Sequence, residues 1–573
     1  MRLFSKYHFL KGSIFCGLAL VFSGLLNAQK PLESTDLFDA PLEIPLYLSG
    51  NFGELRSNHF HSGLDIKTQQ STGIAVKTSA RGFVSRIKIQ HGGYGKALYI
   101  QHPSGHTSVY AHLDRYAGKI EAYVKKHQYA RTTYEIELFP EPDELVVERD
   151  ELVAFSGNTG SSGGPHLHYE IRNSSQEPLN PLAFNFNIKD NKPPYVRDIY
   201  VYTLNKTSCV NNQQGRIGVR LTKNADGVLR SEPLKVIGEV GFGIIAYDQQ
   251  NTSNLNGVYR IDTSINGTEL YSITMDKFSF NETRYINHQI DYAYFKKNKR
   301  RILKLFIDEF NPLSMQQANA FDGKIIIEES KDYVYRIVLK DFAGNTSEVE
   351  IPLQYDNNQK APEYTENTEL FYIEKGLASS HKLGPWQIEI PAHTLYKNAY
   401  LDFQHTQNSI KLHADTIPLH KNISVIYDLS NYKIDDRSKL YLARHLYKDF
   451  TAYTDSYIQD NKLIAKTRLF GDYALAIDSI SPSIKPVNFR DKQWISKLDK
   501  LELEIEDKES GIEAYRATVN GDFILMEYDY KTNRLTHYFS DKVVTETENH
   551  LSVNVVDKTG NSTTFEAVFF RKP

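Results

Sequence analysis

The chain has 573 residues and a formal net charge of −3 at pH 7, so it is long enough for several domains, which usually run about 100 to 200 residues each. This charge gives no basic face, and the sequence therefore does not indicate nucleic acid as a partner. The 37 tyrosines and 30 phenylalanines favour β-sheets. With only two cysteines, stability must come from packed cores and not from disulfides.

The N-terminus has the pattern of a secretory signal peptide. Three basic residues precede an apolar stretch over residues 14–26, which is too short to span a bilayer comfortably. We therefore predict a signal peptide over residues 1–28, cut after Ala28, that takes the protein across the inner membrane to the periplasm, the cell envelope or the exterior. Lipidation of Cys16 is disfavoured, because a phenylalanine precedes it where a small residue is expected. No later segment is long and apolar enough to cross a membrane.

Three short motifs supply the side chains of a hydrolytic metal site. They are His-Ser-Gly-Leu-Asp at 61–65, Tyr-Ala-His-Leu at 110–113 and Gly-Pro-His-Leu-His-Tyr-Glu at 164–170. Residues i and i+2 of a strand face the same side, so one imidazole of the last motif can bind metal while the other faces a bound water. A catalytic zinc keeps three protein ligands and an open position for water, whereas structural sites are usually closed by cysteines. The motifs therefore indicate metal-assisted hydrolysis.

In this order the motifs resemble the lysostaphin-type zinc endopeptidases of peptidoglycan, over about residues 45–185. The resemblance implies a small antiparallel β-sheet metallopeptidase domain of the duplicated-hybrid-motif kind, with a narrow groove and one Zn²⁺. Carried over position by position, it implies the metal ligands His61, Asp65 and His168. It also implies that His112 and His166 flank the metal-bound water as base and transition-state stabiliser.

Other hydrolase patterns fit less well. The sequence contains no His-Glu-x-x-His helix of the thermolysin kind. Neither tryptophan, Trp386 or Trp494, is followed by histidine, as a related group of D-alanyl peptidases would require. A Gly-x-Ser-x-Gly nucleophile elbow between a strand and a helix is also missing.

Residues 116–150 separate the second and third motifs by a longer stretch than the resemblance implies. Long structureless loops in compact domains tend to be lids, binding loops or disordered segments. We therefore expect this insertion to overhang the groove and to limit which substrates enter.

The rest of the chain breaks into short alternating strands and contains an internal repeat. In both copies a glycine precedes an Asn-Gly turn and a later Asp-x-x-Gly-Asn turn, which spans residues 341–345 in the first copy and 557–561 in the second. We predict a mainly β protein in which the metallopeptidase domain is followed by three β-sandwich modules. The predicted domains are the metallopeptidase at 29–189, an immunoglobulin-like sandwich with an insertion at 190–360, a β-rich module at 361–478 and a second immunoglobulin-like sandwich at 479–573.

Two charged features of these modules have ordinary explanations. The basic run over residues 296–301 is expected to be a solvated loop or strand edge. Aspartates of the Asp-x-x-Gly-Asn turns could be calcium ligands, but turn formation explains them without a metal.

The sequence thus predicts a secreted zinc metalloendopeptidase that hydrolyses peptide cross-links of bacterial peptidoglycan with metal-activated water. Its partners would be peptidoglycan peptides and envelope proteins that contact the C-terminal modules. One alternative is a non-catalytic envelope protein whose peptidase fold docks or regulates a wall hydrolase. Another is a surface adhesion or assembly protein whose peptidase processes protein.

Overall fold

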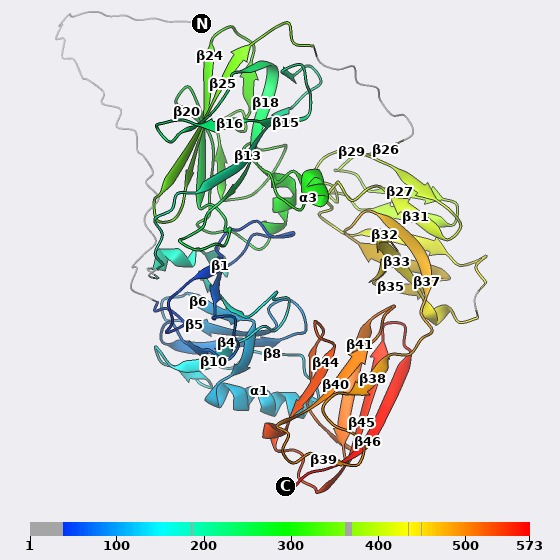
Figure 1. Ribbon diagram of the computed structural model, residues 1–573. Helices are drawn as coiled ribbons and strands as arrows, with labels where there is room; N and C mark the ends of the chain where they lie inside the picture. The colour runs from blue at the N-terminus through cyan, green and yellow to red at the C-terminus, as the bar shows by residue number, and fades with distance from the viewer. Residues whose placement is uncertain are drawn as a thin grey trace, which may run out of the picture.

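The computed structural model describes residues 38–572 except 185, 187, 361–369, 434 and 449. The predicted signal peptide lies outside these residues. The described chain is mainly β, as predicted, and its strands group into four modules (Figure 1). Within the described ranges, no helix is long and apolar enough to cross a membrane.

The first module is built on a large antiparallel sheet in the order β1-β2-β11-β6-β5-β4-β8, with β12 beside β11 and β9 beside β4. A smaller sheet, β3-β10-β7, completes it. Because β2, β11 and β6 are neighbours, the three sequence motifs meet at one place in the sheet. The elements are β1 (Leu48–Gly50), β2 (Leu64–Lys67), β3 (Ala75–Lys77), β4 (Gly82–Ile89), β5 (Lys96–Gln101), β6 (Thr107–Ala111), β7 (Leu113–Tyr116), α1 (Gly118–Arg131), β8 (Ile136–Leu138), β9 (Val146–Val147), β10 (Leu152–Ser156), β11 (His166–Arg172), β12 (Pro178–Leu179) and η1 (Pro181–Phe184).

Strand β11 shows how the sequence sets the two faces of this sheet. Its alternate residues Leu167, Tyr169 and Ile171 are fully buried in the apolar core. The polar residues between them face the other side, as the two-residue period of a strand requires. His168 lies directly opposite Asp65 on β2 and opposite the last residue of β6. The register therefore brings predicted ligands from separate motifs side by side.

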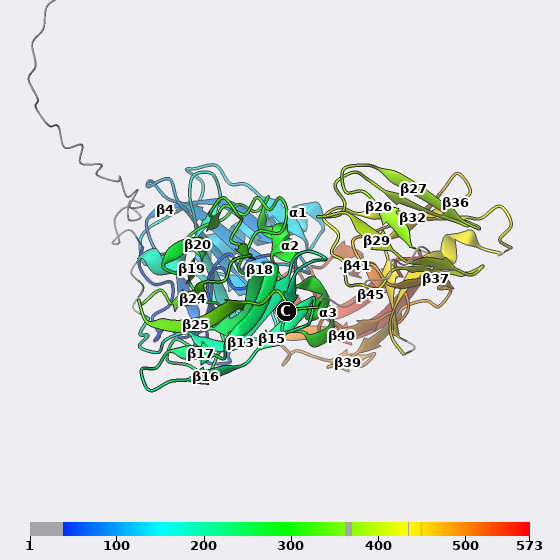
Figure 2. The same cartoon turned by 90° about the horizontal axis from the view of Figure 1, so that it is seen from above.

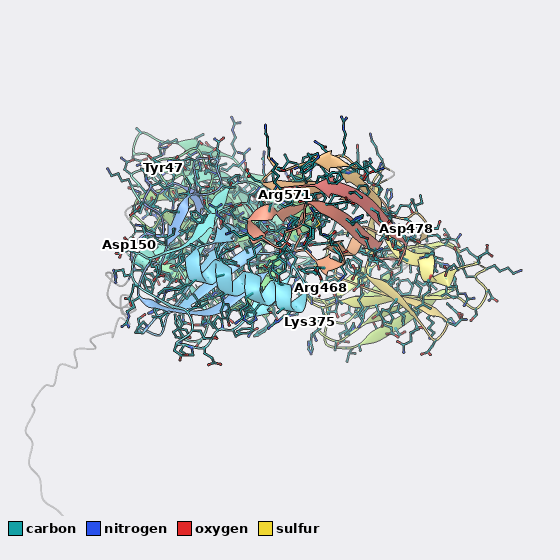
Figure 3. The ribbon with its side chains drawn as sticks, turned by 90° about the horizontal axis from the view of Figure 1, so that it is seen from below. Tyr47, Asp150, Lys375, Arg468, Asp478 and Arg571 are labelled. Atoms are coloured by element: carbon teal, nitrogen blue, oxygen red, sulfur yellow. The ribbon has the colours of Figure 1, made fainter. Side chains whose placement is uncertain are left out.

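Residues 116–150 are not a structureless loop over the groove, so the expectation of a lid is wrong. Helix α1 places Ile120 and Val124, one turn apart, in the core of the first module. Strands β8 and β9 pair with β4 and extend the main sheet. This segment is long because it completes the core. Its helix α1 also contacts the fourth module, where Tyr129 donates to Asp541 at 2.6 Å, whereas Asp150 at its end lies on the far side of the first module (Figure 3).

The second module follows the strand path β15-β13-β18-β25-β24-β19-β20-β22, and the long strand β18 pairs with several neighbours. The basic run does not form a loop or strand edge throughout, because Lys296 belongs to helix α3 and forms an ion pair with Asp415 of the third module at 2.5 Å. The elements are β13 (Tyr195–Thr203), β14 (Cys209–Val210), β15 (Arg216–Val219), β16 (Leu221–Lys223), β17 (Leu229–Ser231), β18 (Leu234–Tyr247), β19 (Arg260–Ile265), β20 (Thr268–Thr274), η2 (Thr283–Tyr285), α2 (Ile286–Gln289), α3 (Tyr292–Asn298), β21 (Leu303–Lys304), β22 (Gln316–Ala318), β23 (Ile325–Ile327), β24 (Asp332–Lys340) and β25 (Thr346–Tyr355).

The third module packs two five-stranded sheets, β27-β28-β32-β36-β35 and β30-β31-β37-β33-β34, around one apolar core. Its elements are β26 (Phe371–Ile373), β27 (Ser379–Leu383), β28 (Trp386–Ile390), β29 (Ala399–Leu401), β30 (Phe403–His405), β31 (Ser409–Leu412), β32 (Ile423–Asp428), η3 (Arg437–Lys439), β33 (Leu440–Tyr447), β34 (Phe450–Thr454), β35 (Ser456–Gln459), β36 (Lys462–Thr467) and β37 (Asp472–Ile477).

The fourth module is a smaller sandwich of the sheets β38-β40-β44-β43 and β39-β46-β45-β41-β42, which enclose their own core. Its elements are β38 (Ser483–Pro486), β39 (Gln493–Trp494), β40 (Lys500–Glu506), β41 (Ile512–Val519), β42 (Asp522–Phe523), β43 (Glu527–Asp529), β44 (Arg534–Tyr538), η4 (Phe539–Asp541), β45 (Glu548–Asp557) and β46 (Ser562–Phe570).

The four modules are not arranged in a linear row, because the fourth module contacts the first. Seen from above, the first and second modules lie on one side of the molecule and the third and fourth on the other (Figure 2). The fourth module then reaches back to the first (Figure 1), where Leu525 joins the apolar core of the first module. A partly buried ion pair between Lys96 and Glu527 at 2.7 Å crosses the same boundary. The first module therefore contacts both the second and the fourth module.

Candidate metal site

The three predicted ligands converge on one buried point. Nε2 of His61 lies 3.1 Å from Nδ1 of His168, and both nitrogens lie 3.0 Å from Oδ1 of Asp65. All three residues are buried. Burial alone would raise the pKa of Asp65, but its neighbouring histidines outweigh this and hold the pKa well below its usual range. Asp65 is therefore an ionised oxygen donor between two imidazoles.

The outer nitrogen of each ligand imidazole is fixed by an acceptor. Nδ1 of His61 donates to the carbonyl oxygen of Asn51 at 2.7 Å, so its Nε2 presents a lone pair to the shared point. Nε2 of His168 donates to Oε1 of Glu170 at 2.8 Å, which directs its Nδ1 to the same point. Such outer hydrogen bonds fix the tautomer and the ring orientation of metal-binding histidines.

This donor set fits zinc. Zinc bonds of about 2.0–2.1 Å at tetrahedral angles place neighbouring ligand atoms roughly 3.3 Å apart. The observed separations of 3.0 to 3.1 Å come close to that value before any ion is bound. Two imidazole nitrogens and one carboxylate oxygen are also the kind of three-ligand set that catalytic zinc sites use.

His112 and His166 lie beside the three ligands, as the motifs predicted, with their rings 4.8 Å apart. Nδ1 of His112 donates to the carbonyl oxygen of Thr159 at 2.9 Å, and Nδ1 of His166 donates to that of Gly164 at 2.8 Å. Because a carbonyl only accepts, Nε2 of His112 is left to act on a substrate or a water, whereas Nε2 of His166 lies 3.3 Å from Oδ1 of Asp65. Burial, followed by the neighbouring His168 and His166, lowers the pKa of His112 to about 3. His112 is therefore neutral, and its Nε2 carries a lone pair.

The backbone at His112 is unusual. Its φ of 57° lies in the left-handed region, which residues other than glycine seldom adopt. The residue stands between β6 and β7, where the chain leaves the main sheet for the smaller one. Backbone conformations of this kind cluster at functional sites, where the surrounding structure holds them in place.

A chain of buried charges extends from His168 along the polar face of β11. Glu170 also accepts a hydrogen bond from Nε of Arg172 at 2.7 Å, from Ser62 at 2.6 Å and from the hydroxyl of Tyr94. Burial would raise the pKa of Glu170, but Arg172 and His168 outweigh this and lower it. Burial would lower the pKa of His168, yet its bonds to Asp65 and Glu170 raise it to about 9. In the metal-free protein His168 is therefore a cation held between two carboxylates.

A cavity of about 840 Å³ opens beside the ligands and is lined in part by Asp65 and His166. The first module contributes most of its wall, including Tyr47 from the segment before β1. The rest comes from residues 251–253 of the second module. The candidate substrate groove is thus shared between two modules, and residues 116–150 take no part in its described lining.

The fourth module contacts the loop that leads into the last motif. Lys531 donates to the carbonyl oxygens of Asn158 and, at 3.3 Å, of Ser162. Tyr530 donates to the carbonyl oxygen of Gly160 at 3.3 Å. Since the carbonyl of Thr159 in this loop orients His112, the fourth module buttresses the loop that positions a candidate proton acceptor.

The structure brings together all five residues that the motifs predicted, but sequence reasoning missed the groups that orient them. Glu170 could have been found, because it stands two residues after His168 and so shares its face of the strand. Asn51 and Thr159 act through backbone carbonyls, which any residue type would supply. No side-chain pattern could have identified those two positions.

Comparisons with known proteins match two parts of the chain. Residues 59–131 match Peptidase family M23, and residues 377–478 match the Zu5-like domain. A DD-carboxypeptidase/endopeptidase, Mpg, of Neisseria meningitidis serogroup B is 33% identical over 129 residues, which cover 22% of this chain and 24% of that protein. An uncharacterized metalloprotease of Haemophilus influenzae is 32% identical over 123 residues, which cover 22% of this chain and 20% of that protein. The match thus spans only about a quarter or less of the length of these curated relatives.

Two solved structures are each similar to about a quarter of the chain. The catalytic domain of the prophage-encoded M23 protein EnpA from Enterococcus faecalis is 21% identical, covers 26% of this chain and 98% of that chain, and has a TM-score of 0.20. The catalytic domain of lysostaphin from Staphylococcus simulans is 21% identical, covers 23% of this chain and 87% of that chain, and has a TM-score of 0.18.

Proposed function

We propose that this chain is a zinc metalloendopeptidase that cleaves peptide cross-links of bacterial peptidoglycan, because residues 59–131 match Peptidase family M23. The observation that carries the proposal is the convergence of His61, Asp65 and His168, with two further histidines beside them and a cavity at their side. The names of the relatives in Neisseria favour a peptide of the cell wall as the substrate.

The three converging residues would hold the zinc. When bound, zinc would polarise the scissile carbonyl and bring the pKa of a water ligand toward neutrality. Nδ1 of His112 is engaged by the carbonyl of Thr159, so its Nε2 would take the proton that the attacking water loses. His166 lines the cavity, and its Nε2 side would contact the carbonyl oxygen as negative charge develops there. The proton held on His112 would then pass to the departing amine.

The cavity suits an extended peptide that lies between modules. Its wall combines the first module with residues 251–253 of the second. A polymeric substrate could enter from the side and leave again without a lid having to open. The predicted signal peptide supports a location in the periplasm or the cell envelope, where such a substrate is found.

Release of muropeptides from purified peptidoglycan tests the proposal. The mature protein should convert cross-linked dimers to monomers, lose this activity on chelation and regain it with zinc. Binding to peptidoglycan without release would favour the non-catalytic alternative. Cleavage of a protein substrate with no release from peptidoglycan would favour the processing alternative.

A further inference from the structure

Three aspartates outside the peptidase site converge where the second module begins. Asp190 belongs to the segment that joins the first two modules, Asp248 follows β18, and Asp341 follows β24. Each offers a carboxylate oxygen, and the three oxygens lie within 4.8 Å of one another. Residues 151 positions apart in sequence thus supply one acidic cluster, which we call the linker cluster.

The linker cluster holds more negative charge than its surroundings balance. Asp248 and Asp341 are each only 2% exposed. Among the described residues, none of the three carboxylates forms an ion pair with a lysine or an arginine. Burial, together with the charges of Asp190 and Asp341, raises the pKa of Asp248 to about 7. Each carboxylate accepts a local backbone hydrogen bond, Asp190 from Lys192 at 3.1 Å, Asp248 from Gln249 at 2.8 Å and Asp341 from Asn345 at 2.8 Å. These local bonds do not explain why carboxylates from three distant segments converge.

A further buried oxygen stands beside the linker cluster without a partner. Asn256 is 1% exposed, and its Oδ1 accepts no hydrogen bond from any described residue, while its Nδ2 donates to Gln250 at 2.9 Å. Asn256 and Asp248 form an antiparallel bridge with hydrogen bonds of 2.7 and 3.0 Å. Residues paired in this way project their side chains from the same face. The unpartnered amide oxygen therefore lies on the side where the carboxylates gather.

The same arrangement recurs at the start of the fourth module. Asp478 in the preceding linker, Asp507 after β40 and Asp557 at the end of β45 also bring three oxygens within 4.8 Å. Asp478 lies where the third and fourth modules meet (Figure 3). Ser510 here is 2% exposed, its backbone amide donates to Asp478 at 3.2 Å, and its hydroxyl has no partner among the described residues. Each of the two modules thus gathers three aspartates.

We propose that Asp190, Asp248 and Asp341, with the amide oxygen of Asn256, bind a calcium ion. Calcium takes six to eight oxygen ligands from carboxylates, amide and backbone carbonyls and water, and it tolerates irregular geometry. Zinc prefers nitrogen and sulfur donors, which the linker cluster lacks, and magnesium demands a nearly regular octahedron. The ion would neutralise the crowded charge and satisfy the unpartnered oxygen.

This calcium site would brace one wall of the candidate substrate groove. The chain from Asp248 runs directly into residues 251–253, which line the cavity. It then reaches Gly257, which exchanges two hydrogen bonds of 2.7 and 2.8 Å with the side chain of Asn51. The carbonyl of Asn51 in turn orients His61. The inference does not depend on peptidase activity, because it concerns a separate ion and is tested by binding and melting.

Calorimetry and thermal melting of the zinc-loaded, full-length protein test the site. Calcium titrated into the wild-type protein should bind and should raise the melting temperature as its concentration rises. Asp248→Asn should remove one binding event, or weaken it more than about tenfold, since the ligand charge falls. The matched control Asp332→Asn changes an exposed carboxylate of the same module and should behave like the wild type.

A crossing of melting temperatures would distinguish a cation site from a purely structural cluster. Without calcium, Asp248→Asn should melt at or above the wild-type temperature, because it relieves repulsion, and with calcium it should melt below. Asn256→Asp should melt lower without calcium and should be rescued by calcium. A wild-type protein that binds no calcium, or an Asp248→Asn variant that binds and responds like the wild type, would overturn the proposal.

Discussion

Replacing Glu170 by glutamine tests whether the polar face of β11 sets the zinc affinity. The substitution keeps the shape of the side chain but removes the charge that accepts from Nε2 of His168 at 2.8 Å. The imidazole should become a weaker and less firmly oriented ligand. Changes of this kind typically cost about 10- to 100-fold in metal affinity or activity. The expected loss of zinc binding free energy is therefore about 1.4–2.7 kcal/mol.

The same substitution leaves Arg172 without its buried counter-charge. Arg172 is 7% exposed and bonds Glu170 through two nitrogens, at 2.7 and 2.6 Å. Breaking one side of a buried ion pair typically destabilises a protein by about 3–5 kcal/mol. Lost stability could therefore imitate lost zinc affinity in the single variant. The double variant Glu170→Gln, Arg172→Met removes the orphaned charge and should regain most of the stability.

Zinc affinity measured by competition with a chromophoric chelator, together with thermal melting of the metal-free protein, separates the two effects. The double variant should melt near the wild-type temperature and still bind zinc about 10- to 100-fold more weakly. Glu177→Gln, at a partly exposed carboxylate just beyond β11, serves as the matched control and should keep full affinity. Wild-type zinc affinity in the double variant would refute the role assigned to Glu170.

Three further predictions concern the first module and its surroundings. Lys531→Ala should lower kcat several-fold at unchanged zinc content, because the loop that orients His112 loses its contact with the fourth module. Steady-state kinetics together with metal analysis checks this prediction. Zinc affinity should rise with pH up to about 9, because His168 must first release the proton that its raised pKa retains. Calorimetry in buffers of different protonation enthalpy should show the release of about one proton per zinc bound at pH 7. Gly63→Ala should destabilise the protein by about 1–3 kcal/mol in thermal melts, because its Cβ would lie 2.3 Å from the carbonyl oxygen of Tyr169. The control Gly164→Ala should be tolerated, because its Cβ would meet no atom within 4 Å.

The convergence of the five residues was predictable because they lie in short motifs. His166 and His168 share a strand face, as their spacing predicted, and the resemblance to lysostaphin-type peptidases is confirmed by the match over residues 59–131. The mainly β fold is confirmed for the same kind of reason, since alternation such as that of β11 is local. The domain boundaries, the immunoglobulin-like identity of two modules and the signal peptide stay predictions.

Long-range packing could not be predicted from the sequence. Residues 116–150 look like a loop, because their charged residues hide the one-turn spacing of Ile120 and Val124 that buries α1. Nothing around Lys96 indicates that its partner is Glu527, more than 400 positions away. The groove wall at residues 251–253 depends in the same way on how two modules meet. Such contacts are set by tertiary packing, which leaves no periodic signal.

A paired comparison of His168→Ala and His112→Ala on purified peptidoglycan tests the central claim most directly. Zinc content and muropeptide release are measured on both variants and on the wild type. His168→Ala should lose both the metal and the activity, because it removes a ligand. His112→Ala should keep its zinc and lose release by at least about 100-fold, because it removes only the proton acceptor. Release at the wild-type rate by both variants, or a full zinc content in His168→Ala, would contradict the account.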